Sequence, residues 1–286
     1  MDKKFFIYSI VLLLLVGTTF IIYKSQSIKR LYKAEVQKRI HQNIKVSDDL
    51  VLTEKDTNHL PEPVRKYLSY VGAMGKEKVH NVRIVFNGEM KMDRKKDWIK
   101  VKTQQYNFFG NPARLFYIRG NMFGIPLVGL DSYYDGKGNM LIKLASLVTV
   151  ADEKGEEMDI GEIVTLFNDM CLLTPATLID RKIHWETIDQ LTVKGTFSDQ
   201  NYQVSAVLYF NEEGALINFV TEDRYYAPIG EPPQKVKWST PVKDYKEING
   251  VKVPTYGEAI WHFPEGDFCY AKFRVKEIEY NCEQFL

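Results

Sequence analysis

Cysteine is scarce in this chain, and neither sign of charge is in excess. Three cysteines among 286 residues cannot build a disulfide framework, and they lack the close pairing of a zinc or thiol-redox site. The 38 basic and 37 acidic side chains leave a net charge of +1, whereas a dedicated nucleic-acid-binding domain is normally basic. We therefore expect no nucleic-acid partner.

Known catalytic motifs are missing as well. The chain has no G-x-S-x-G elbow, no P-loop and no H-E-x-x-H pair. The glycine-rich stretch 135–139 lies between two strand-like runs, so it indicates a hairpin turn rather than a phosphate loop. Asp131 with Asp135, or Glu186 with Asp189, could form a carboxylate pair, but the spacing does not determine their separation. We predict no metal site, no cofactor and no catalytic residue.

One long apolar run is present near the N-terminus. Residues 5–23 contain no charged side chain, and a helix of that length covers roughly 28 Å, close to the hydrocarbon thickness of a bilayer. The run is longer than the core of a cleaved signal, and no small-x-small cleavage site follows it. We expect a tail at residues 1–4 and a single-pass transmembrane helix at residues 5–23.

Residues 24–45 are basic and have a helical period of apolar side chains. This juxtamembrane helix could lie on anionic headgroups or pack on the globular part of the chain, and we slightly favour packing. Residues 46–59 are polar and indicate a linker. We expect residues 60–286 to form one domain that folds without the first 45 residues.

From residue 79 onward the apolar period changes from helical to alternating. Val82, Ile84 and Phe86 alternate with polar or smaller neighbours, and Asn249-Gly250 is a strong hairpin signal. Such segments predict about a dozen strands in one antiparallel sheet. Helical spacing over 159–179, with Asp159 and Glu162 as a capping box, interrupts them. The predicted fold is α+β: a curved antiparallel sheet, an incomplete barrel, covered by short helices.

Two groups of residues are candidates for ligand binding. The segment 120–130 is apolar and broken by glycines and a proline, so it indicates either a mobile lip over an apolar cavity or a loop packed in the core. The second group places polar side chains among aromatic strands, where an Arg and an Asp on neighbouring inner strands would need each other or a ligand headgroup. The alternative is that they lie at strand ends in water. The candidates are Met122, Phe123, Ile125, Leu127, Asp131, Tyr133, Arg224 and Trp238.

Several segments resemble an uncharacterised bacterial family of membrane-anchored proteins from about residue 60 to the C-terminus. The matching segments are Leu60-Pro61-x-Pro63-Val64-x-x-Tyr67-Leu68, Gly129-Leu130-Asp131-Ser132-Tyr133-x-x-Gly136-x-Gly138, Phe167-Asn168-Asp169-Met170-Cys171-x-x-x-Pro175-Ala176-Thr177-Leu178-Ile179, Asp223-Arg224-Tyr225, Trp238-Ser239-Thr240-Pro241 and Val253-Pro254-x-Tyr256-Gly257-Glu258-Ala259-x-Trp261. The resemblance implies no activity. The strand–helix–strand order is also loosely similar to periplasmic lipoprotein carriers, whose open half-barrels hold acyl chains.

These observations favour a membrane-tethered module that binds an apolar or amphipathic ligand, such as a lipid, in the concave face of the sheet. The alternatives are a non-enzymatic interaction module of a cell-envelope complex and a hydrolase with a hidden carboxylate site. Basic residues after the apolar run favour a cytoplasmic domain by the positive-inside rule, but long domains translocate largely regardless of charge. The carrier resemblance leads us to expect an extracytoplasmic domain.

Overall fold

The computed structural model describes residue 8 and residues 26–42, 51–122, 124–228 and 231–286. The expected transmembrane helix at residues 5–23 lies outside the described residues, Tyr8 excepted. Of the helices that are described, none has the length and apolar character needed to cross a bilayer.

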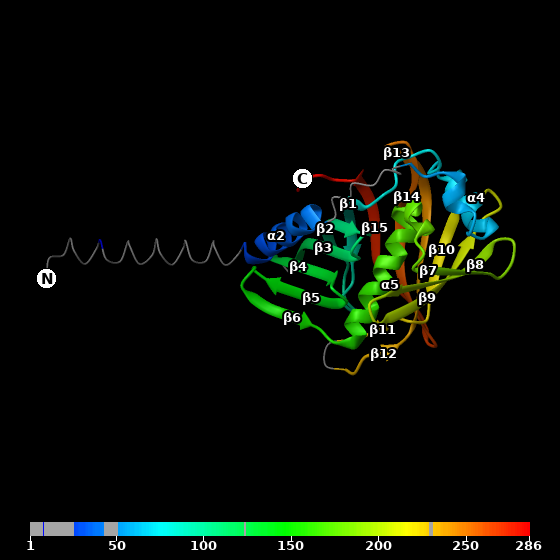
Figure 1. The fold of residues 1–286 in the computed structure, drawn as a ribbon. Helices are drawn as coiled ribbons and strands as arrows, with labels where there is room; N and C mark the ends of the chain where they lie inside the picture. Colours follow the sequence, from blue (N-terminus) through cyan, green and yellow to red (C-terminus); the bar gives the residue numbers. More distant parts are fainter. Residues whose placement is uncertain (1–7, 9–25, 43–50, 123, 229–230) are drawn as a thin grey trace.

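Thirteen antiparallel strands form one continuous curved sheet (Figure 1). The order is β6-β5-β4-β3-β2-β1-β15-β14-β13-β10-β9-β8-β7, so that in the described chain β6 and β7 remain the two edges of an open barrel. This confirms the prediction of a large antiparallel sheet. The strands are β1 (Asn81–Met90), β2 (Ile99–Phe108), β3 (Ala113–Met122), β4 (Ile125–Tyr134), β5 (Lys137–Leu144), β6 (Val148–Glu153), β7 (Ile183–Thr187), β8 (Thr192–Asp199), β9 (Tyr202–Phe210), β10 (Leu216–Thr221), β13 (Lys237–Ile248), β14 (Val251–Phe263) and β15 (Gly266–Tyr280); β11 (Tyr225–Tyr226) and β12 (Gln234–Lys235) pair separately.

The local signals in the sequence explain the hairpins. Val82, Ile84 and Phe86 of β1 all lie in the core on the concave face, as their period of two predicts. Asn249 and Gly250 both have positive φ, 53° and 77°, and they join β13 to β14, where Ile248 pairs with Val251. This is the geometry that an Asn-Gly turn favours.

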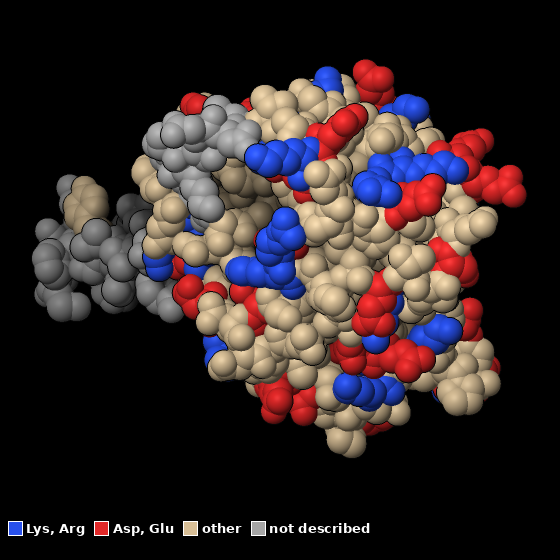
Figure 2. Space-filling view, turned by 45° about the vertical axis from the view of Figure 1, so that its right-hand side comes forward, with Lys and Arg blue, Asp and Glu red and all other residues tan. Residues whose placement is uncertain are grey.

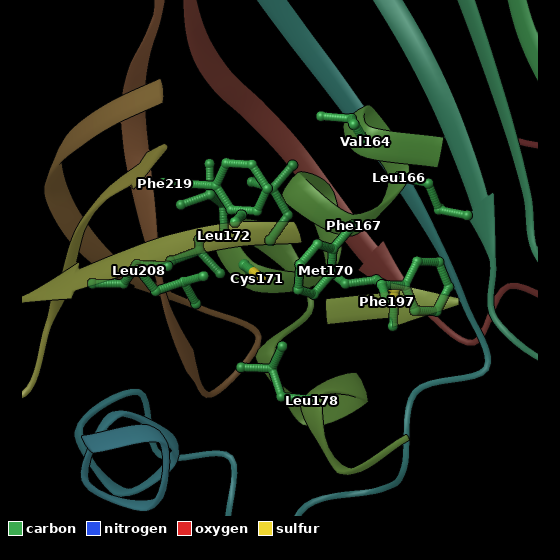
Figure 3. Close-up of a cluster of buried hydrophobic side chains, with 14 of the residues drawn as sticks. Val164, Leu166, Phe167, Met170, Cys171, Leu172, Leu178, Phe197, Leu208 and Phe219 are labelled. Carbon is green, nitrogen blue, oxygen red and sulfur yellow. The ribbon is translucent and has the colours of Figure 1, made fainter. Parts of the chain in front are cut away.

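The long helix α5 (Glu156–Leu173) and the short helix η1 (Pro175–Ile179) connect the two edge strands and lie against the concave face. Figure 3 shows one side of α5 packed against aliphatic and aromatic side chains of β8, β9 and β10. Phe167 stacks on Phe197, with ring centroids 5.6 Å apart, and meets Phe219 edge-on at 5.5 Å. The other side of α5 is therefore left to face β3 and β4.

The predicted start of this helix is wrong. The helix begins at Glu156, and the residue at its N-cap is Gly155, not Asp159. Instead the Asp159 carboxylate accepts hydrogen bonds from the Gly138 backbone N–H at 2.6 Å and from the Tyr202 hydroxyl at 2.8 Å. Its role is to fasten α5 to β5 and β9.

The helix α2 (Ser27–Gln42) packs on the convex face of the sheet. Tyr32 and Val36 are fully buried, and the Tyr32 ring stacks on Tyr117 of β3 with a centroid separation of 5.1 Å. Of the two arrangements considered for residues 24–45, the structure shows packing on the domain. These contacts also make α2 part of the folded unit.

The segment expected as a linker, residues 46–59, is described from residue 51 onward. Leu52 is fully buried, and its backbone N–H donates to the carbonyl of Lys76 at 2.8 Å. The short helix α3 (Glu54–Thr57) follows, and α4 (Glu62–Tyr70) then covers one end of the sheet. Charges of both signs are interspersed over the face in Figure 2, in keeping with the near-zero net charge.

Candidate functional site

A cavity of about 240 Å³ lies between α5 and the concave face of the sheet. Most of its wall is apolar, and a group of charged and amide side chains occupies one part of it. The apolar lining includes Phe86, Met90, Phe116, Met140, Leu172, Trp238, Val242, Ala259, Phe273 and Val275; the polar lining includes Gln105, Arg114, Asp131, Thr165, Asn168, Asp169, Arg224 and Thr240.

Arg114 is the centre of the polar part. Its guanidinium is buried between β3 and α5, with 5% of the residue exposed. Nη1 donates to Asp131 Oδ2 at 3.0 Å and to Glu162 Oε2 at 2.9 Å, and Nε donates to Asp169 Oδ2 at 3.1 Å. One cation therefore holds three carboxyl groups, which is the condition under which buried charges are tolerated.

Two side-chain amides on β2 also form hydrogen bonds with the Asp169 carboxylate. Gln105 Nε2 and Asn107 Nδ2 donate to the same carboxylate oxygen at 2.7 Å and 3.0 Å. Both side chains point to the concave face, because residues two apart in a strand share a face. Burial raises the pKa of Asp169, although Arg114 and the two amides stabilise its anion.

Glu162 and Asp131 form a coupled pair within this cluster. Burial first, and the neighbouring Asp131 carboxylate second, raise the pKa of Glu162 to about 8 against the pull of Arg114. Glu162 is therefore protonated at neutral pH. Asp131 Oδ1 is buried, and no hydrogen-bond donor among the described residues reaches it. The hydroxyl of a protonated Glu162 can donate to this oxygen, whereas two ionised carboxylates would have no donor between them.

Arg224 is the second cation at the cavity and is bound in a different way. Its guanidinium lies 4.4 Å from the ring centroid of Trp238 and 5.8 Å from that of Trp261, and Nη1 donates to Thr165 Oγ1 at 2.5 Å. Within the described chain it forms no ion pair of 4 Å or less with a carboxylate, unlike Arg114. It is only half-buried, so some of its five donors are open to an anionic or polar group.

The structure brings three of the predicted residues together at the cavity: Asp131, Arg224 and Trp238. Tyr133 is close in sequence but is not part of the lining. It is fully buried, and its hydroxyl donates to Asp199 at 2.7 Å.

The segment 120–130 is a regular hairpin of β3 and β4, not the broken loop that we expected. Met122, Ile125 and Leu127 are not among the residues lining the cavity, and Ile125 is 45% exposed; Phe123 lies outside the described residues. The glycines and proline are accommodated because Gly120 and Pro126 stay in register with partners across the hairpin. The segment is therefore not a lip over the concave cavity; it forms the tip of a hairpin at the end of the sheet.

Sequence reasoning missed Arg114, Glu162 and Asp169. A signal for Arg114 was present, because it is two residues from Phe116 on β3 and therefore points to the same, concave face. Glu162 and Asp169 are seven residues apart and so lie on one side of α5. The suggested pair of Asp131 with Asp135 is not formed, because the Asp135 side chain is 86% exposed.

No group of three or more His, Cys, Asp or Glu side chains suited to a metal ion occurs in the described ranges. Cys171, Cys269 and Cys282 are free thiols. The chemistry that this arrangement offers is ionic and hydrogen-bonding recognition next to an apolar wall, with a protonated Glu162 beside the Asp131 side chain.

Three solved structures are similar to the chain at low identity. A domain named for outer membrane lipoprotein sorting from Vibrio parahaemolyticus is 9% identical with a TM-score of 0.43, over 77% of this chain and 91% of that one. A DUF1329 family protein from Desulfovibrio piger is 11% identical with a TM-score of 0.41, over 77% and 94%. A LolA superfamily protein from Nitrosomonas europaea is 9% identical with a TM-score of 0.36, over 76% and 93%.

No match is found among curated protein sequences. A family model, in contrast, matches residues 50–273, from the strand-like bridge at Val51 into β15. This range contains the sheet except the second half of β15, the helix α5 and the whole cavity lining except Val275. The chain therefore belongs to a family of unknown function, DUF6544.

Proposed function

We propose that this protein is a membrane-tethered module that binds a small amphipathic ligand between α5 and the concave face of the sheet. The observation that carries the proposal is a cavity with an apolar wall and a half-buried arginine, Arg224, that has no carboxylate partner in the described chain. Ligand sites commonly combine such a wall with a few polar groups that fix orientation. The tether is the apolar run at residues 5–23.

The volume limits the size of the ligand. At about 240 Å³ the cavity is below the range of roughly 300–1,000 Å³ that is typical for small-molecule sites. It therefore fits one short acyl chain or a ring system better than a whole two-chain lipid. The apolar part of the ligand would lie along Phe116, Phe273 and Val275, and its polar or anionic end would lie at Arg224.

Native mass spectrometry of the full chain, released from detergent, tests the proposal by detecting a co-purified ligand. We expect a bound species with a single apolar chain or ring system. Arg224→Gln should lose it, because the neutral amide cannot pair with an anionic end. The matched control is Lys235→Gln, which removes one exposed charge from β12 and should retain the ligand.

A wild-type chain with no bound species, and no uptake of an added fatty acid, would contradict the proposal. So would equal retention by Arg224→Gln and by the control, since the arginine would then have no part in binding.

A second candidate function has one specific observation in its favour. Glu162, with a pKa raised to about 8 by burial and by Asp131, is an acid next to a carboxylate, and such unequal pairs serve as the acid and base of hydrolytic enzymes. Hydrolysis of fluorogenic esters and glycosides by the full chain tests this function. Hydrolytic activity that Asp131→Asn abolishes would support this second function. If no substrate is hydrolysed, ligand binding is the one function that is still proposed.

A further inference from the structure

A broad groove of about 980 Å³ crosses the sheet over β1–β4, β14 and β15. Lys100 and Lys102 lie on the convex face, because they alternate with Val101, which packs in the concave core. One carboxylate, Glu89, lines the groove among the described residues. The basic groove is defined by Lys100, Lys102, Arg119, Lys272, Arg274 and Lys276.

Most of this positive charge is available to a partner. Lys100, Lys102, Arg119 and Lys276 are exposed, and none of the four forms an ion pair within the described chain. Lys272, in contrast, lies 3.8 Å from Glu89, and Arg274 lies 3.2 Å from Asp244. Four cations without an ion pair, next to Lys272 and Arg274, which each pair with one carboxylate, produce a local field that favours anions on a chain of net charge +1.

Two hairpins end next to the groove with exposed apolar side chains. The β3–β4 and β5–β6 turns are neighbours, because the Ala145 N–H donates to the Pro126 carbonyl at 2.8 Å. The hairpin tips are defined by Ile125, Leu147 and Val148, which are 45%, 47% and 62% exposed. Aliphatic side chains beside cations are the composition with which peripheral surfaces enter the headgroup region of a bilayer.

The direction of α2 places the start of the described chain at the same end. Near its C-terminus Arg39 lies 4.1 Å from the ring centroid of Tyr134, at the end of β4. One turn after its start, Tyr32 stacks on Tyr117, which pairs with Leu130 nearer the middle of β4. The helix thus runs in the same direction as β4, which starts at Ile125, and it begins toward the hairpin tips (Figure 1).

We propose that the basic groove and the hairpin tips together form a surface that docks on an anionic lipid bilayer. This inference rests on the proposed tether, which would enter the membrane from the same end of the sheet. The lysines and arginines face lipid phosphates, and the three aliphatic side chains enter the headgroup layer. Docking would hold the sheet against the bilayer in one orientation.

Lysine footprinting of the full chain in lipid nanodiscs tests the proposal. One set of discs contains phosphatidylcholine alone, and the other contains about one third phosphatidylglycerol, enough for a negative surface potential. We expect N-hydroxysuccinimide acetate to modify Lys100, Lys102 and Lys276 several-fold more slowly in the anionic discs. Lys55 and Lys194, on α3 and β8, are internal controls and should react equally in both.

A pair of variants tests the hairpin tips. Val148→Asp should restore fast modification of Lys100 and Lys102 in the anionic discs, because a carboxylate is repelled from the headgroup layer. The matched control is Ile188→Asp, which places the same charge at a 55% exposed aliphatic position after β7 and should leave the protection intact.

Equal lysine reactivity in the two kinds of disc would overturn the proposal. Equal protection by inorganic phosphate in detergent would overturn it as well, since the groove would then be a site for free anions. If the chain does not co-elute with the neutral discs, the proposed tether is contradicted independently of the docking surface. Co-elution with anionic discs alone would still support the docking surface, and co-elution with neither would contradict both.

Discussion

Glu162 carries a proton that the unfolded chain would release at neutral pH. Its pKa rises from 4.5 to about 8 on folding, through burial first and through Asp131 second. Between these values the folded state holds more protons than the unfolded state, so the stability associated with Glu162 falls as the pH rises through this interval. It is fully present below pH 4.5 and lost above about pH 8.

Glu162→Gln should therefore reduce the loss of stability between pH 5 and pH 8, because the amide does not titrate. Urea midpoints measured across this interval check the prediction. The control is Glu157→Gln, at an exposed position on the same helix, which should keep the wild-type slope. Parallel slopes for the wild type and Glu162→Gln would show that Glu162 is not the titrating group.

Arg114→Leu should destabilise the domain by about 3–5 kcal/mol, because it leaves the buried Asp169 and the partly buried Asp131 without their cation. Arg119→Leu is the matched control on the same strand; its side chain is exposed, so the expected change is within about 0.5 kcal/mol. Chemical denaturation at neutral pH measures both. Similar values for the two variants would contradict the central role given to Arg114.

The residues of the site were only partly predictable. Asp131, Arg224 and Trp238 were identified because charged side chains next to aromatic strands are unusual. Arg114 was not, since its carboxylate partners Glu162 and Asp169 lie 48 and 55 residues away on a helix. No local pattern shows which side of α5 faces which strand.

At the scale of elements, the close approach of α5 to β5 explains why residue 138, just after the β4–β5 turn, is a glycine. A Cβ atom at this position would lie 2.6 Å from the Met158 carbonyl oxygen, so α5 crosses β5 only where the strand has no side chain. The turn and the strands were predictable from alternation and glycine placement. The close approach was not, because it depends on where the helix lies.

The truncation that removes residues 1–45 should behave differently from what the sequence suggested. It deletes α2 and uncovers Tyr106, Leu115, Tyr117 and Leu130 on the convex face. We expect aggregation or a clearly lower melting temperature, whereas a chain starting at residue 26 should remain soluble and keep its near-ultraviolet circular dichroism. Equal melting temperatures for the two truncations would show that α2 contributes little to the fold.

At the scale of the molecule, the side of the membrane on which the sheet lies is the main expectation to test. We predict an extracytoplasmic domain. A C-terminal alkaline phosphatase fusion should be active, and a C-terminal green fluorescent protein fusion exported in the unfolded state should be dark. The reverse pattern would show that the basic residues after the apolar run retain the domain in the cytoplasm.

The pairing of β1 with β15 affects how the protein folds. Most neighbouring strands are also consecutive in the chain, so β1–β6 and β7–β10 can form early through short loops. The seam between β1 and β15 instead pairs Val82 with Tyr280, and just beyond it Asn81 donates to the carbonyl of Cys282, 201 residues away. Closing so long a loop is slow. During synthesis β1 therefore has an unpaired edge until the last strand leaves the ribosome, and in this interval the nascent chain is most exposed to aggregation.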